Sequence, residues 1–286
     1  MRKEDSGAAG GGGRGAHGPK FVPRSKQRAG AAPARARSSK PPLRLQTTTL
    51  WEYPSQHYAP GASGGTLDKT TQGEASYTGA TPSWVIWQLL MRYTREKDLV
   101  VDPMVGSGTT LDVARDIGRR GLGYDLNPTR EDVIRADARK LPLEDGKADF
   151  VFIDPPYSTH VDYSDDPRCI GKLDAAGEDG GAAYYNAMRA VIGEIDRVLK
   201  PRRYMALYVS DSWKKHKGKS AAATPGVFMP IGFELFSIMR ERFVPVDVIA
   251  VVRHNKKLTR GNWHKAAEEG NFFLRGFNYL FIMKKA

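Results

Sequence analysis

Four short apolar runs between residues 99 and 154 each end on an aspartate, and this pattern predicts parallel strands that share one edge. A glycine turn and an amphipathic helix over residues 111–117 separate the first two runs. A strand, turn, helix and strand in this order favour the α/β class with a mostly parallel sheet. The runs are Leu99–Asp102, Gly121–Asp125, Val133–Asp137 and Ala148–Asp154.

Further apolar patterns predict the rest of one domain, which we expect to extend from residue 47 to residue 286. A buried helix is expected to have Thr81 as its N-cap and Pro82 as its first helical residue, and to end near Arg95. Residues 158–183 and 211–230 are expected to be loops on the substrate side of the sheet. The remaining expected helices are 184–199 and 233–240, and the remaining strands are 204–210, 247–252 and 277–283.

The fourth run leads directly into Asp154-Pro155-Pro156-Tyr157. Neither proline has a backbone N–H to donate, so the strand is expected to end there. A carboxylate and an aromatic ring are therefore held at the carboxyl end of a strand, which is the edge where open α/β sheets bind ligands. Taken alone, these four residues also fit an ordinary loop.

A glycine turn follows the first run. Gly106 and Gly108 allow a ligand to approach the backbone, and the helix that begins near Gly108 offers unpaired N–H groups and a partial positive charge. Asp102 is placed to attract an ammonium group, and Asp125 is placed to bind ribose hydroxyls. With Asp137 at the end of the third run, these acids favour a nucleoside pocket. A dinucleotide is also compatible, although the third glycine of Gly-x-Gly-x-x-Gly is absent.

Composition narrows the class of protein. The chain has 286 residues, of which 40% are hydrophobic, and a mean hydropathy of −0.49. It holds no run of the ~20 apolar residues that a membrane span needs, and its first residues lack the apolar core of a secretory signal. The single cysteine, Cys169, excludes an intramolecular disulfide and a zinc site made of cysteines, and we interpret it as an incidental loop residue.

The net charge of +12 is concentrated at the amino end. Residues 1–46 hold eleven of the 44 basic residues and two of the 32 acidic ones, and we expect this Gly/Ala/Arg/Pro-rich tail to be disordered. The tail either holds nucleic acid loosely or is a solubilising extension. Two basic clusters later in the chain favour either contact with DNA phosphates or solvated loops. They are Lys214, Lys215, Lys217 and Lys219, and Arg253, Lys256, Lys257 and Arg260.

The two sites together resemble those of the S-adenosylmethionine-dependent methyltransferases that modify the exocyclic amino group of adenine (N6) or cytosine (N4) in DNA. Residues 102–110 are similar to the methionine-binding turn of that family and residues 154–157 to its catalytic motif. Residues 81–84 resemble the segment that closes over the methionine end of the cofactor. The resemblance covers residues 47–286. It implies a Rossmann-like class I methyltransferase fold, with a mostly parallel seven-stranded sheet and helices on both faces.

The resemblance also implies a role for each motif. Asp154 and the carbonyl of Pro155 would accept the two N–H groups of the target amine, and Tyr157 would stack on a base flipped out of the duplex. No covalent enzyme intermediate and no metal ligand is expected. The implied catalytic residues are Asp154, Pro155, Pro156 and Tyr157, and those for S-adenosylmethionine are Thr81, Pro82, Ser83, Asp102, Pro103, Gly106, Gly108, Thr109, Thr110, Asp125 and Asp137.

The aspartate at position 154 favours adenine N6, because the cytosine enzymes of the family more often carry serine there. Cytosine N4 in DNA, a base amine in RNA, a protein side-chain amide and an inactive module that binds cofactor and DNA remain as alternatives. Methylation of cytosine carbon 5 is disfavoured, since it needs a Pro-Cys pair and Cys169 follows Arg168. DNA is the expected partner, in the cytoplasm or at a bacterial nucleoid. The oligomeric state and a partner restriction nuclease stay open.

Overall fold

The computed structural model describes residues 42–59, 72–74, 77, 79–214, 226–254, 258 and 260–286. All of these residues belong to one compact unit of the chain, residues 40–286. Residues 1–41 of the expected basic tail lie outside the described residues. Five lysines of the two basic clusters also lie outside them, namely Lys215, Lys217, Lys219, Lys256 and Lys257.

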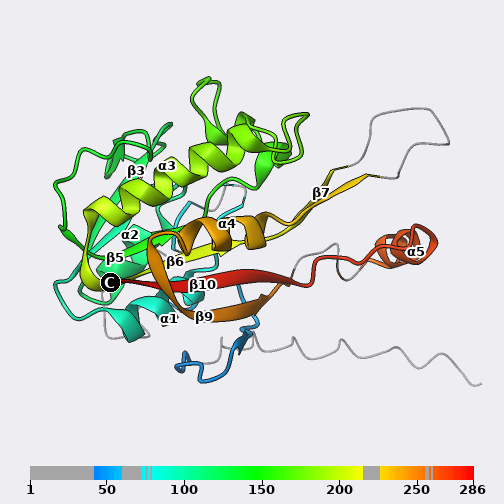
Figure 1. The fold of residues 1–286 in the computed structure, drawn as a ribbon. Helices are drawn as coiled ribbons and strands as arrows, with labels where there is room; N and C mark the ends of the chain where they lie inside the picture. Colours follow the sequence, from blue (N-terminus) through cyan, green and yellow to red (C-terminus); the bar gives the residue numbers. More distant parts are fainter. Residues whose placement is uncertain are drawn as a thin grey trace, which may run out of the picture. The chain divides into compact units, whose positions relative to one another are not determined.

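A central sheet organises this unit (Figure 1). Its strands are β1 (Leu50–Trp51), β2 (Leu99–Asp102), β3 (Arg120–Asp125), β4 (Val133–Arg135), β5 (Ala148–Ile153), β6 (Leu199–Val209), β9 (Phe243–Val252) and β10 (Phe277–Lys285). The strand order is β1-β9-β10-β6-β5-β2-β3-β4, and all neighbouring pairs are parallel except the two that β10 makes. The predicted α/β, Rossmann-like class is confirmed.

The predicted number of seven strands is wrong, because β1 adds an eighth at the edge of the sheet. Leu50 pairs with Ala250 and Trp51 with Val251. The Trp51 side chain is only 2% exposed, and its indole Nε1 donates to the Thr48 carbonyl at 2.9 Å. A strand of two residues is too short to leave a periodic pattern in the sequence.

Helices cover both faces of the sheet (Figure 1). They are α1 (Ser83–Tyr93), α2 (Thr109–Asp116), α3 (Ala182–Val198) and α4 (Ile231–Met239). Helix α5 (Gly261–Glu269) lies beyond the sheet, and short 3-10 turns occur at Ser158–His160 and Ile170–Lys172. Side chains alternate along the central strand β5. Phe150 and Phe152 pack with α1 and α2, whereas Val151 and Ile153 pack with α3 and α4. Strands buried on both faces explain the nearly continuous apolar runs.

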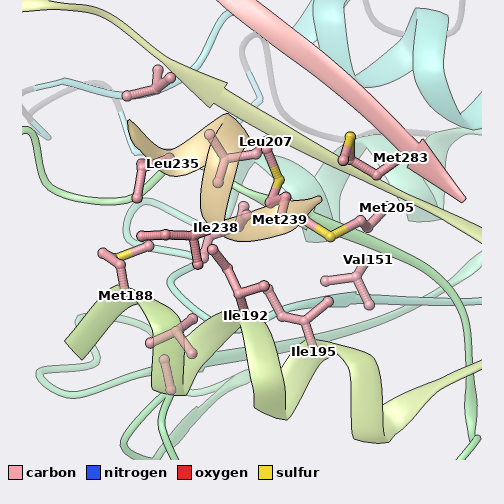
Figure 2. Packing of buried hydrophobic residues seen from close by; sticks show 14 of the residues in the cluster. Val151, Met188, Ile192, Ile195, Met205, Leu207, Leu235, Ile238, Met239 and Met283 are labelled. Carbon is pink, nitrogen blue, oxygen red and sulfur yellow. The ribbon is translucent and has the colours of Figure 1, made fainter. Parts of the chain in front are cut away.

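The packing of the α3 and α4 side is seen in Figure 2, where Val151, Met205 and Leu207 of the sheet meet Ile192 and Ile238 of the helices. All five side chains are nearly or fully buried. This core fixes the start of the loops that follow β5 and β6. The functional groups at the sheet edge therefore stand on a rigid base.

Several predicted boundaries need correction. Helix α1 begins at Ser83 and ends at Tyr93 rather than near Arg95, and its N-cap is Pro82, not Thr81. The Thr81 hydroxyl instead donates to Asp154 Oδ2 at 2.5 Å, so a tertiary contact replaces the expected cap. The strands β6 and β9 begin at Leu199 and Phe243, earlier than predicted, and in each a proline and other exposed residues follow the first residue.

Two elements beyond the sheet were not predicted. A hairpin of β7 (Ser212–Lys214) and β8 (Val227–Met229) lies within the expected loop 211–230. Helix α5 lies in the basic, aromatic stretch after β9, and none of its residues is buried. It therefore has no apolar stripe by which the sequence could reveal it. No helix in the described ranges has the length and hydropathy needed to cross a membrane.

Candidate active site

The carboxyl ends of the parallel strands open onto one cavity of about 1130 Å³. This volume exceeds the ~300–1,000 Å³ of a usual small-molecule site, so two ligands fit side by side. Twelve of the predicted site residues line it: Thr81, Asp102, Pro103, Gly106, Thr109, Thr110, Asp125, Asp137, Asp154, Pro156, Tyr157 and Arg253. The tertiary structure thus brings the glycine turn and the Asp154 motif to one place.

The glycine turn connects β2 to α2. Gly106 and Gly108 both adopt the left-handed backbone region, with φ of +48° and +79°, and Gly108 is the N-cap of α2. Asp102 accepts hydrogen bonds from the Thr110 hydroxyl at 2.6 Å and the Met104 N–H at 3.0 Å. Asp125 accepts from the Gly106 N–H at 3.1 Å. The two acids therefore shape the turn as well as line the cavity.

The Asp102 carboxyl is buried, and this burial raises its pKa to about 7. The hydrogen bonds from Thr110 and Met104 oppose the rise, while the negative charges of Asp154 and Asp125 add to it. A cationic ligand beside Asp102 would favour the ionised form. Binding of an ammonium group beside Asp102 would therefore lower the raised pKa of this carboxyl and stabilise its ionised form.

Tyr77 lies against the glycine turn, and no sequence motif pointed to it. A Cβ atom placed on Gly106 would lie 2.7 Å from the Tyr77 hydroxyl oxygen. The Tyr77 ring stacks on Tyr163 with ring centroids 6.4 Å apart, and both rings line the cavity. The phenol of Tyr77 has a raised pKa, first because of burial and then because of Asp125. The Tyr77 ring therefore packs directly on the glycine turn, and Tyr77 and Tyr163 form an aromatic part of the cavity wall.

Replacing Gly106 with Ala is expected to weaken cofactor binding by about tenfold or more, because the new Cβ enters the Tyr77 ring and strains a left-handed backbone. Calorimetric titration with S-adenosylmethionine measures the affinity. Gly146→Ala is the matched control, since Gly146 has a similar φ of +58° but open space around it. Equal affinities of the Gly106→Ala and Gly146→Ala variants would contradict this role of the turn.

A buried arginine holds the turn from behind. Arg130 donates to both carboxylate oxygens of Asp112 at 2.9 and 3.0 Å, and to both oxygens of Asp132 at 2.7 and 2.8 Å. Its Nη1 also reaches the carbonyls of Ser107 and Gly108 at 3.3 and 3.4 Å. The Arg130 side chain is 7% exposed and that of Asp112 is fully buried. The sequence did not reveal this group, because Arg130 and Asp112 are 18 residues apart along the chain.

The second half of the cavity is the end of β5. Asp154 accepts hydrogen bonds from the Thr81 hydroxyl at 2.5 Å on one oxygen and from the Tyr157 hydroxyl at 2.7 Å on the other. Asn278 donates its side-chain N–H to the Tyr157 hydroxyl at 3.3 Å. The Tyr184 hydroxyl donates to the Pro156 carbonyl at 2.8 Å, which fixes the proline turn. The segment before α1 and the turn after β5 thus orient the Asp154 carboxylate, and β10 supports it through the bond from Asn278 to Tyr157.

Burial raises the pKa of Asp154 to about 7, against the hydrogen bonds from Thr81 and Tyr157 and the positive charge of Arg253. Burial and the neighbouring Asp154 charge also hold the pKa of Tyr157 well above its usual value. The tyrosine therefore stays protonated and acts as a donor to Asp154. A carboxylate with a pKa near neutrality is suited to accept a hydrogen bond or a proton.

Four of the predicted catalytic and cofactor-binding residues, Pro82, Ser83, Gly108 and Pro155, do not line the cavity. Ser83 is buried and donates to Gln72 Oε1 at 2.8 Å. Asp137 lines it but is also paired with Arg139 at 2.6 Å. In the basic clusters, Arg253 donates to Ser210 Oγ at 3.3 Å, Lys214 is paired with Asp174, and Arg260 is the N-cap of α5. Cys169 is buried and lines the cavity, so it is not a loop residue in solvent.

A Rossmann-like sheet with a glycine turn and acids at successive strand ends is typical of sites that bind nucleoside ligands. Residues 23–136 match the model of the N6/N4 DNA methylase family. The match includes Asp102, the glycine turn and Asp125, and it ends before Asp154.

Two curated relatives are similar over 63 residues. They are the type II methyltransferase M2.LlaDCHI of Lactococcus lactis subsp. cremoris, at 32% identity, and the type II methyltransferase M2.DpnII of Streptococcus pneumoniae, at 33%. The aligned segment is 22% of this chain and 23% and 24% of those proteins. The chain therefore spans about a quarter of the length of the relatives it matches. A solved S-adenosylmethionine-dependent methyltransferase from Methanosarcina mazei is 14% identical, with a TM-score of 0.42 over 69% of this chain and 96% of that one.

Proposed function

We propose that this chain transfers a methyl group from S-adenosylmethionine to the exocyclic amino group of a base in DNA, with adenine N6 as the first choice. The observation that carries the proposal is the shared cavity. The glycine turn with Asp102 and Asp125 lines one part of it, and Asp154 and Tyr157 line another. The family match of residues 23–136 supports the same reaction class.

The residues present fit the cofactor. Gly106 has a left-handed backbone and no side chain, which lets the Tyr77 ring pack on the turn that lines the cavity. Asp102 would hold the ammonium group, and Asp125 would hold the ribose hydroxyls while it keeps its bond to the Gly106 N–H. When bound, S-adenosylmethionine supplies an electrophilic methyl group on a sulfonium. Thr81 lines the cavity, and its hydroxyl donates a hydrogen bond that orients the Asp154 carboxylate.

The end of β5 would act on the amine. An aromatic amine is a poor nucleophile, since its lone pair is delocalised into the ring. Asp154 at the cavity wall would accept one of its N–H groups and favour a more tetrahedral nitrogen. The carbonyl of Pro155 is the proposed acceptor of the other, although Pro155 does not line the cavity. Asp154, with a pKa of about 7, would also take the proton that the nitrogen gives up. Thr81 and Tyr157 hold that carboxylate in place, so positioning supplies much of the rate.

The proposed partner is duplex DNA with the target base flipped out, because a base inside the stack cannot reach Asp154 at the cavity wall. The flipped base would lie beside the Tyr157 ring. A DNA substrate would place the chain in the cytoplasm, at the nucleoid in a bacterium. A partner nuclease would make the reaction part of a restriction-modification pair.

The test is direct. The purified chain is incubated with labelled S-adenosylmethionine and, in separate reactions, duplex DNA, RNA and protein, and the modified product is identified by mass spectrometry. N6-methyldeoxyadenosine is the expected product. N4-methyldeoxycytidine would move the proposal to cytosine, and label in RNA or protein alone would contradict it.

A further inference from the structure

Phe273 is the most exposed of the large hydrophobic side chains in the described ranges. It is 86% exposed, compared with 60% for Leu50 and 59% for Phe233. It lies between helix α5 and strand β10, and it lines the same cavity as Asp154. Covering an exposed phenyl ring contributes about 1.5–3 kcal/mol of favourable free energy. A ligand that covers Phe273 would therefore be stabilised by this contact.

The chain topology places this residue at the functional edge of the sheet. β10 is antiparallel to β6 and β9, so the segment that enters β10 lies at the carboxyl ends of those strands. The hairpin β7–β8 leaves from the end of β6, and α5 follows β9. Figure 1 shows β7 and α5 beyond the ends of β6 and β10. Phe273 therefore stands where a macromolecular substrate would approach the cavity.

A contact links this segment to the hairpin. The Arg275 guanidinium lies over the Phe228 ring of β8, 5.0 Å from its centroid. Phe228 is 42% exposed and Trp213 of β7 is 38% exposed. Trp213, Phe273 and Arg275 line the cavity, and such a combination of aromatic rings and cations suits nucleic acid bases and phosphates.

The charge of the segments near Phe273 favours a polyanion as the ligand that covers this ring, rather than an apolar protein surface. Residues 211–230 and 253–275 together hold ten Lys/Arg and three Asp/Glu. The other residues between 47 and 286 hold 23 Lys/Arg and 27 Asp/Glu, so they are net acidic. The cationic excess of residues 47–286 therefore comes from these two stretches of sequence, and Lys214, Arg253, Arg260, Lys265 and Arg275 are their basic residues within the described ranges. Such an excess neutralises phosphates along a duplex.

We propose that Phe273 is a wedge that enters the base stack of duplex DNA and fills the space left by the flipped target base. This inference rests on the proposed function. Extruding a base costs a few kcal/mol of stacking and pairing, and an apolar ring inserted at the same step offsets part of that cost. The basic segments hold the backbone on either side, while Asp154 receives the base.

Phe273→Ala tests the wedge on two duplexes that differ only opposite the target base. On the fully paired duplex, kcat/KM is expected to fall by about tenfold or more, because the flipped state loses its support. On a duplex with an abasic site opposite the target, the base is already unpaired, so the loss is expected to be less than about threefold. The affinity for S-adenosylmethionine is expected to be unchanged.

Phe233→Ala is the matched control. Phe233 is 59% exposed on α4, packs edge-on against Tyr279, and does not line the cavity. It is expected to keep the wild-type rate on both duplexes. Equal rates of wild type and Phe273→Ala on the paired duplex would overturn the wedge and leave the methyltransferase proposal standing. Equal losses on both duplexes would also overturn it, and a wild-type chain that methylates no DNA would overturn both proposals.

Discussion

Replacing Asp154 with Asn is expected to lower methyl transfer to DNA by about 100-fold or more, with little change in cofactor affinity. The amide has one acceptor oxygen in place of two, and its NH₂ group would face a donor, either the Thr81 or the Tyr157 hydroxyl. The target amine would then lose its acceptor at the moment when charge develops on nitrogen. Single-turnover rates on DNA and calorimetric titration of S-adenosylmethionine separate the two effects.

Asp162→Asn is the matched control, because Asp162 lies in the loop after Tyr157 and its side chain is 77% exposed. It is expected to transfer methyl groups at the wild-type rate. If Asp154→Asn kept the wild-type rate, the amine would have a different acceptor and the proposed chemistry would be wrong.

Asp154→Asn is expected to lower activity but to raise the stability of the fold. Asp154 has a folded-state pKa of about 7 against an ordinary value of 3.8, so the folded chain binds a proton that the unfolded chain releases between these pH values. Stability therefore falls as pH rises through that window. Asp154→Asn removes this loss, and its melting temperature should exceed that of wild type by more at pH 8 than at pH 5. Activity of the wild type should rise across about pH 7 as the carboxylate ionises.

Replacing Arg130 with Met is expected to destabilise the fold by about 3–5 kcal/mol, the usual cost of leaving one partner of a buried ion pair alone. The Asp112 side chain is fully buried, and its other cation, Arg115, is 56% exposed and 3.4 Å away. The carbonyls of Ser107 and Gly108 would also lose a donor, so cofactor binding should weaken along with stability. Urea denaturation gives the change in free energy of unfolding.

Arg189→Met is the comparison, because Arg189 also pairs with a carboxylate through two bonds, but on the surface. Arg189 and Glu241 are 45% and 49% exposed, so the loss is expected to be below about 1 kcal/mol. Adding Asp112→Asn to Arg130→Met should recover part of the lost stability, since no buried charge is then left uncompensated. A double variant less stable than Arg130→Met would show that the cost has another origin.

Much of the fold could be predicted from local sequence. The apolar runs that end on Asp102, Asp125 and Asp154 are strands in the structure, because strands buried on both faces leave a nearly continuous apolar signal. Strand β1 and helix α5 could not be predicted in this way. The first has only two residues, and the second has no buried face.

The candidate site also has features that the local sequence predicts and features that it does not. The sequence by itself determined the chemistry at each strand end: two glycines with positive φ, acids beside them, and a carboxylate held on two prolines. These follow from local backbone rules and from the fact that parallel strands share an edge. Only the tertiary structure decided how those groups are held. Thr81 bonds to Asp154 across 73 residues of chain instead of capping α1, Asn278 reaches Tyr157 from the last strand, and Phe273 stands exposed at the cavity mouth. Such contacts depend on which segments the packed core brings together, and no local pattern records that.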